Sequence, residues 1–306
     1  MPALLKQESQ GICNDSLLAK GGYVKGVTMK LEKFSKKSGK AIARDYLNIV
    51  KFIKAFRILM LFGVFSIAYY MGRGLVGTPT VLAYCVIVLC LNFLARRKQM
   101  KEYSLLPLVL TEMLDAEKYL ELCLELSAKI KNTTGMSALN LANAYFWNGQ
   151  YENALTILDN AKFKGSKNTE FMLEVQSDAV RLNVLSRMGN FAPCEEIIEK
   201  MKSRVAASQG NPRLSHILND FLVNMESNLA IGKGEYDNYI TMEASMYAPP
   251  STLNHISRQY NLANCYMNLG STNMAVTYLE NTLSKPGNLY IQKQAKEKLH
   301  TLKGEK

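Results

Sequence analysis

The side chains best placed for recognition chemistry in this chain are asparagines that recur in one register. One stands six residues before each of four glycines, Gly149, Gly189, Gly234 and Gly270. A side-chain amide offers two donors and an acceptor, which suits bidentate bonding to the main chain of an extended peptide with little demand on its sequence. The asparagines of the register are Asn143, Asn183, Asn228 and Asn264, and Asn140 and Asn261 precede the first and last by three residues, on the same helix face.

Three arginines, Arg181, Arg187 and Arg258, lie close to this register and would bias such a ligand toward acidic segments. Asn is less favourable than Ala inside a helix by roughly 0.5–0.7 kcal/mol, so four in register invite an explanation. The alternative to peptide binding is a ladder in which each asparagine bonds a neighbouring helix and only holds the stack together. Asn is also abundant throughout the chain, so a second alternative is that these asparagines share a register by chance.

The sequence carries no motif for catalysis or for a metal. It lacks HExxH, a Walker loop, GxSxG and any Cys/His pairing within one motif. The six cysteines form no CxxC pair, and the three histidines, His216, His255 and His300, stand more than one helical turn apart. We therefore expect neither enzymatic activity nor a cofactor.

The four glycines predict turns between helices from about residue 105 onward. The first clear unit runs from Asn140 through Gly149 to Ala154, and the last runs from Asn261 through Gly270 to Ala275. Small residues at matching positions let the two helices of a hairpin approach closely; they are Ala142, Ala154, Ala263 and Ala275. A hairpin of this kind cannot bury its apolar face alone, so several must stack.

Both units resemble the tetratricopeptide repeat, a 34-residue helix-turn-helix motif. The glycine spacings of 40, 45 and 36 residues depart from that length, and a divergent first unit with Glu117, Leu120 and Leu124 lacks the glycine. The resemblance covers roughly residues 105–290. It implies an α-solenoid with a concave surface that binds a protein or peptide and a register of asparagines that faces this surface. A polar last helix, about 289–302, would cap the stack.

Two apolar runs precede the repeats, 55–72 and 74–95. Apart from Arg57 near the start of the first, neither run contains a charged residue. At about 1.5 Å per residue, their 18 and 22 residues give roughly 27 and 33 Å, close to the thickness of a bilayer core. We therefore predict a transmembrane helical hairpin over 55–95, against the alternative of a buried hairpin in a soluble core. The GxGxxG pattern at 72–77 has no strand before it and no acid after it until Glu102, which favours a hairpin turn over a dinucleotide site.

The basic residues bracket this hairpin. The net charge of the chain is +11. Residues 30–57 contribute +7, from nine Lys and Arg against two acidic residues, and residues 96–101 contribute +4. Residues 102–306, in contrast, carry 20 basic and 22 acidic side chains. The near-neutral repeats argue against a nucleic-acid partner. By the positive-inside tendency, the chain crosses the cell membrane twice with both termini in the cytoplasm.

Residues 30–54 are then expected to form a basic juxtamembrane segment, and residues 96–104 a basic linker. The juxtamembrane segment is either an amphipathic helix that lies on the membrane or a solvated linker. In the first case, residues 30–57 would bind anionic lipids. Residues 1–29 are expected to be a disordered tail or untranslated. Residues 25–29 can be encoded with a ribosome-binding element before Met29, which would indicate a bacterial source.

The fold expected for 105–306 is thus all-α, a solenoid of tetratricopeptide-like repeats behind a membrane hairpin. The expected function is that of a membrane-anchored cytoplasmic adaptor or scaffold, which binds a protein or peptide partner in the concave groove. The alternative is a structural subunit of a membrane complex or homo-oligomer with no separate ligand.

Overall fold

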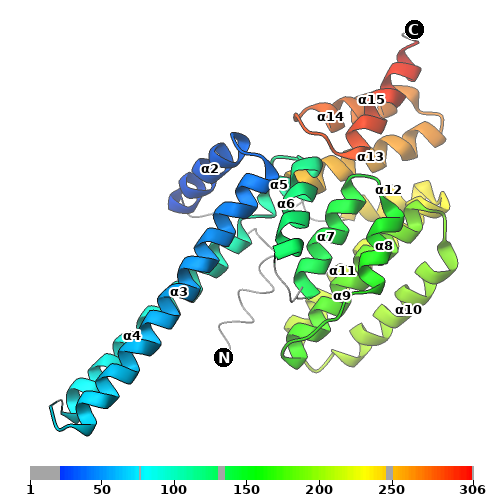
Figure 1. Cartoon of the computed structure of the whole chain (residues 1–306). Helices are drawn as coiled ribbons and strands as arrows, with labels where there is room; N and C mark the ends of the chain where they lie inside the picture. The colour runs from blue at the N-terminus through cyan, green and yellow to red at the C-terminus, as the bar shows by residue number, and fades with distance from the viewer. Residues whose placement is uncertain (1–20, 76, 130–134, 246–250, 305–306) are drawn as a thin grey trace.

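The computed structural model describes residues 21–75, 77–129, 135–245 and 251–304, and no β-strand occurs among them (Figure 1). The all-α prediction is therefore confirmed. The helices are α2 Gly21–Ser35, α3 Gly39–Gly72, α4 Thr78–Ser104, α5 Leu108–Thr111, α6 Ala116–Lys129, α7 Gly135–Trp147, α8 Tyr151–Asp159, α9 Lys167–Arg187, α10 Phe191–Ala207, α11 Pro212–Lys233, α12 Tyr236–Ser245, α13 Thr252–Asn268, α14 Thr272–Leu283 and α15 Tyr290–Lys303.

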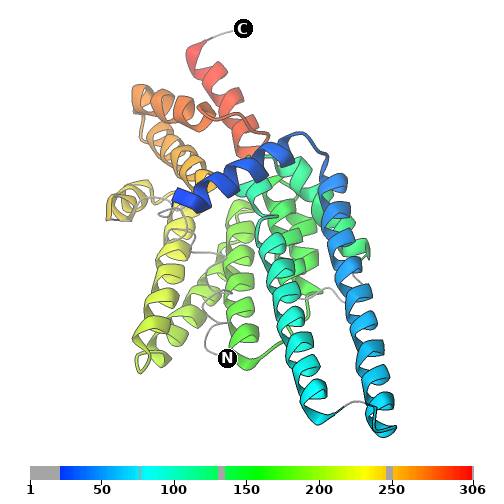
Figure 2. The ribbon, with the colours of Figure 1, turned by 90° about the vertical axis from the view of Figure 1, so that its left-hand side faces the viewer.

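Helices α3 and α4 form the predicted apolar hairpin. They run side by side away from the rest of the chain, and the turn that joins them lies at the far end (Figures 1 and 2). Both are long and apolar enough to cross a bilayer, and only 6% of the apolar window in α3 and none of that in α4 is buried within the chain. The hairpin is therefore not a buried core element of this chain. The described residues of the GxGxxG pattern, 72–75 and 77, lie at the end of α3 and in the segment before α4.

The element boundaries near the hairpin differ from the expected ones. Helix α3 runs unbroken through the expected boundary at 54/55, because the chain has neither Gly nor Pro between Gly39 and Gly63. Helix α4 continues through 96–104 to Ser104, so this stretch is helix rather than a separate linker. Helix α2 includes residues 21–29 of the expected tail, and residues 1–20 lie outside the described part.

The four glycines mark the turns of four helix hairpins, α7 with α8, α9 with α10, α11 with α12, and α13 with α14. Their φ angles are +76°, +78°, +81° and +76° for Gly149, Gly189, Gly234 and Gly270. This left-handed conformation ends a helix and strains any residue with a Cβ. The four alanines at the helix contacts are fully buried. The prediction of stacked helix-turn-helix repeats is confirmed.

The end of the stack packs back against its beginning. The side chain of Asn288 accepts a hydrogen bond from the backbone N–H of Ala116, at 2.6 Å, and donates one to the Asp115 carboxylate, at 2.8 Å. Its own N–H donates to the carbonyl of Leu114, at 3.0 Å. One core cluster contains residues of α3, α5, α6, α7 and α13 together with α14 and α15. Figure 1 shows α13 to α15 together at the top of the view, next to α5. The superhelix is therefore closed by its C-terminal hairpin.

The base of the hairpin is part of the same core. Ile42, Ala43 and Tyr46 on the first turns of α3 are buried in it. Ser38 caps α3 by accepting from the N–H of Ala41, at 3.2 Å, and Gly39 follows at the first helical position. A Cβ at Gly39 would overlap the backbone of α6 at Lys118, so the two helices touch main chain to main chain. The apolar hairpin is thus fixed to the repeat stack at its base.

Candidate functional site

Asparagines of three successive hairpins lie close together with one arginine. We call this group of side chains the inner row; it consists of Asn183, Arg187, Asn228, Asn261 and Asn264. The amide of Asn228 on α11 donates to the side-chain oxygen of Asn183 on α9, at 2.9 Å. Arg187 lies one helical turn after Asn183, and its guanidinium donates to the side-chain oxygen of Asn261 on α13, at 2.8 Å. Among the four asparagines of the register, Asn183 and Asn228 are therefore in direct contact.

Two cations stand over one buried aromatic ring beside this row. The guanidinium of Arg187 lies 5.8 Å from the ring centroid of Tyr260, and the ammonium of Lys298 on α15 lies 5.2 Å from it. Lys298 also donates to the side-chain oxygen of Asn264. Within the described residues, neither cation forms an ion pair with a carboxylate. Burial raises the pKa of Tyr151 at the start of α8, and the positive charge of Arg187 opposes that rise.

The remaining predicted residues have other surroundings. The amide of Asn140 donates to the hydroxyl of Tyr103 at the end of α4, at 3.1 Å. Asn143 is half-buried and has no side-chain hydrogen bond within the described residues. Arg181 pairs with Asp159, at 2.5 Å. The guanidinium of Arg258 binds the Glu243 side chain and its backbone carbonyl, both at 2.6 Å.

The contacts of the inner row are those of the ladder alternative, in which side-chain amides tie helix to helix. A ligand-binding role for the nine predicted residues stays a prediction. Asn143 is the one among the predicted asparagines whose side chain forms no hydrogen bond with the described residues.

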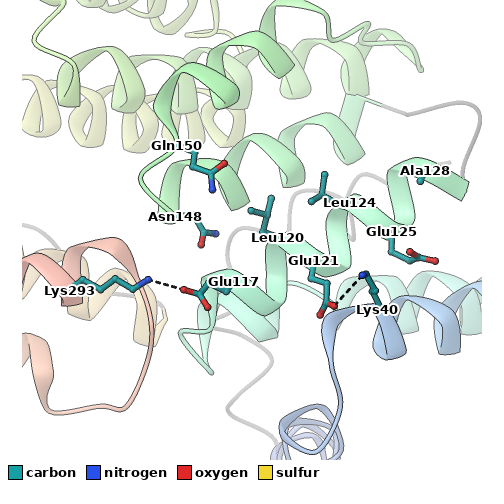
Figure 3. A pocket seen from close by; sticks show the side chains of 10 residues that line it. All are labelled: Lys40, Glu117, Leu120, Glu121, Leu124, Glu125, Ala128, Asn148, Gln150 and Lys293. Atoms are coloured by element: carbon teal, nitrogen blue, oxygen red, sulfur yellow. Dashed lines mark hydrogen bonds and ion pairs between the residues drawn. The ribbon is translucent and has the colours of Figure 1, made fainter.

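A second concave feature lies along α6. We call it the α6 groove; its volume is about 730 Å³, and α6 lines it with Glu117, Leu120, Glu121, Leu124 and Glu125 (Figure 3). These positions fall on one helix face because residues three and four apart are neighbours. Leu124 is 43% exposed, although it is a large apolar side chain.

The charges of the α6 groove are partly paired. Lys293 of α15 lies 2.8 Å from Glu117, and Lys40 of α3 lies 4.0 Å from Glu121 (Figure 3). Glu125 has no ion-pair partner among the residues described. Exposed pairs of this kind contribute about 0–1 kcal/mol each, so another cation can replace either lysine. The groove offers contact surface and carboxylates, with no nucleophile beside them.

The cysteines of the repeats behave as buried apolar side chains. Cys123, Cys194 and Cys265 are buried and free. Burial raises the pKa of Cys123 to about 12, that of Cys194 to about 11 and that of Cys265 to about 12, which disfavours the reactive thiolate. In the described part of the chain, no three His, Cys, Asp or Glu residues gather where they could hold a metal ion.

Sequence reasoning missed Lys298 and Tyr260. The helix that contains Lys298 was expected to be a polar cap, yet Gln292 on it is buried, and Gln294 accepts from the Tyr260 hydroxyl, at 2.6 Å. The spacing of Gln294 and Lys298, four residues apart on one helix face, was the available signal.

Comparison with known proteins identifies one repeat directly. Residues 256–283 match the tetratricopeptide repeat family model, which places the match on α13 and α14 around Gly270. No curated protein and no solved structure matches the chain. The other three hairpins share the glycine turn with this one, and α7–α8 also shares the two buried alanines. The matching positions are buried in the other two hairpins as well, but they hold Leu182 and Cys194 in α9–α10 and Ser227 and Tyr239 in α11–α12. The chain is therefore a tetratricopeptide-repeat-like, all-helical protein with an N-terminal hairpin of two long apolar helices.

Proposed function

We propose that this protein is a membrane-anchored cytoplasmic adaptor that binds a protein partner through its repeats. The observation that carries the proposal is the joining of two elements. An apolar hairpin of bilayer length, exposed along its sides, is fixed at its base to a stack that includes a tetratricopeptide repeat. Such hairpins leave an apolar surface that lipid covers, and such repeats commonly present a binding surface to another chain.

The orientation follows from charge. Cations without an ion pair in the described part gather at the base of the hairpin, whereas the turn holds Arg73 alone. The positive-inside tendency supports a cytoplasmic base, so that both termini and the repeats lie in the cytoplasm and the turn is outside.

For the partner, we propose the inner row and its neighbours. Asn143 is the leading contact, because its amide is half-buried and unbonded within the described chain. The unpaired charges of Arg187 and Lys298 favour an acidic segment over a basic one.

A second candidate is a structural subunit of a membrane assembly. The observation that favours it is the internal bonding of the inner row, in which each side chain already bonds a side chain of another helix. On this alternative the exposed side chains of the α6 groove would contact a permanent neighbour.

Photo-crosslinking in membranes separates the two candidates. A photoreactive residue at Asn143 should yield a discrete adduct with another protein, while the same residue at the exposed Asn153 on α8 serves as control. Asn143→Ala should then weaken capture of that protein and leave the melting temperature unchanged, because it removes no hydrogen bond to the described residues.

Asn183→Ala is the matched comparison, since it removes the bond from Asn228. If capture survives Asn143→Ala, Asn143 does not contact the partner. If Asn183→Ala loses stability and capture together, the inner row is structural and the assembly candidate stands.

A further inference from the structure

The basic residues near the hairpin fall into two groups that the sequence does not separate. Lysines of α2 and of the turn that follows it are paired: Lys30 with Glu102, Lys36 with Glu32, and Lys37 with Asp45. These pairs use the nearby carboxylates. Eight cations on α3 and α4 have no ion pair within the described residues, and they are Arg44, Lys51, Lys54, Arg57, Arg96, Arg97, Lys98 and Lys101.

A cleft opens between α3 and α4, and one of these unpaired cations, Lys98, lines it. We call it the hairpin cleft; its volume is about 540 Å³, and it is lined by Asn48, Phe52 and Phe56 of α3 and by Leu91, Ala95 and Lys98 of α4, among others. Farther along the hairpin the helices are in contact, because the hydroxyl of Tyr84 donates to the carbonyl of Met60, at 3.4 Å. A Cβ at Gly63 would overlap the same hydroxyl.

The hairpin cleft has a polar end and an apolar end. The two helices are antiparallel (Figure 2). Asn48 and Lys98 therefore both lie at the end near the repeats, whereas Phe56 and Leu91 lie toward the turn. The apolar side chains that line the cleft differ in exposure: Phe52 is 72% exposed, Ile49, Phe56 and Leu91 are half-buried, and Ile53 is buried. A cleft that is cationic at one end and apolar along its length matches the shape and polarity of a lipid with an anionic headgroup.

We propose that the hairpin cleft binds one anionic phospholipid, with its phosphate at Lys98 and Asn48 and an acyl chain against Phe52, Phe56 and Leu91. The inference rests on the proposed membrane insertion and deepens it, because it places lipid recognition on α3 and α4 and removes it from the paired lysines of α2. We choose an anionic lipid as the occupant because its charge is complementary to that of the cleft. A second copy of this chain would bring the same cations to the cleft and would therefore be repelled.

Native mass spectrometry of the full-length protein in a nonionic detergent tests the proposal. The probe is an equimolar mixture of phosphatidylglycerol and phosphatidylcholine. The wild-type chain should retain one phosphatidylglycerol in preference to phosphatidylcholine. Lys98→Gln should lower that occupancy about fivefold, as expected for one cation near a phosphate. Lys54→Gln, an unpaired cation that does not line the cleft, should change it much less.

A volume change gives an independent variant. Ala95→Phe fills the hairpin cleft and should abolish lipid retention, while Ala55→Phe on the exposed side of α3 should not. Equal retention by Ala95→Phe and wild type, equal retention of the two lipids, or a lipid-free mass of two chains would overturn the proposal.

Carbonate extraction of membranes keeps this test separate from the proposed function. If the wild-type chain is released by carbonate, membrane insertion itself fails. If it stays in the pellet but carries no phosphatidylglycerol, only the lipid site is wrong.

Discussion

Arg187 on α9 donates a hydrogen bond to Asn261 on α13, at 2.8 Å, although 74 positions separate them and the α11–α12 hairpin lies between them in the chain. The bond joins two helices that are not consecutive in the chain. Together with the bonds of Asn288 to residues 114–116, it closes the stack. The side chains of the inner row therefore hold α9, α11 and α13 together.

The hydrogen bond between Arg187 and Asn261 should contribute more to the free energy of unfolding than an ion pair on the surface does. Arg187→Ala should lower the free energy of unfolding by about 1.5–3 kcal/mol, because a charge-assisted bond to the buried Asn261 is lost. Arg181→Ala removes an exposed pair with Asp159 and should change it by about 0–1 kcal/mol. Urea denaturation of both variants measures the difference, and equal effects would contradict the closed inner face.

The junction between hairpin and repeats should tolerate no Cβ at Gly39. Gly39→Ala forces α3 away from the backbone of α6, which should destabilise the protein by about 1–3 kcal/mol. Gly72→Ala, at the far end of the same helix, meets nothing and is the matched control. Trp147, the single tryptophan, packs against this core, so its fluorescence during urea unfolding reports the loss. A Gly39→Ala midpoint equal to that of Gly72→Ala would show that the junction is loose.

Two turn glycines should differ although their backbones agree. Gly189→Ala places a side chain at a φ of +78° in open space and should cost about 1–2 kcal/mol. Gly149→Ala, at a φ of +76°, adds a contact of 2.7 Å with the ring of Tyr290 on α15, and should cost about 1–3 kcal/mol more. Thermal unfolding followed by circular dichroism ranks the two. The same melting temperature for both would mean that α15 does not pack on this turn.

The buried thiols predict a loss of stability at alkaline pH. Desolvation raises the pKa of Cys123 and of Cys265 to about 12 in the folded chain, whereas an unfolded thiol has a pKa near 8.5. Between about pH 8.5 and pH 10 the unfolded chain has lost these protons and the native chain keeps them, so stability falls as pH rises. Urea midpoints at pH 7.5 and pH 9.5 measure the decline. Cys265→Ala should reduce the decline of the urea midpoint between these two pH values. An unchanged decline would show that Cys265 does not contribute to the loss of stability.

Local patterns predicted most of the repeats. The turns at Gly149 and Gly270, the buried alanines and the buried thiols depend on residues within one hairpin, where a glycine at a helix end and small residues at a helix contact have direct physical meaning. The continuity of α3 through residue 54 was missed because a change from basic to apolar composition does not interrupt backbone hydrogen bonding.

Closure of the stack was not predictable in the same way. Asn288 and Asp115 are 173 positions apart, and neither residue type nor spacing shows which hairpin ends will meet. The summed charge of residues 30–57 likewise did not include the distant Glu102, which pairs with Lys30. The asparagine register was visible in the sequence, but its partners Arg187 and Lys298 depend on the curvature of the superhelix.

Cysteine labelling in intact cells tests the central claim, a membrane hairpin that holds cytoplasmic repeats, most directly. In a background without native cysteines, Arg73→Cys at the turn and Lys202→Cys on α10 are exposed to a membrane-impermeant maleimide. We predict that position 73 is labelled from outside and that position 202 is labelled only after permeabilisation. Labelling of position 202 in intact cells would contradict the account.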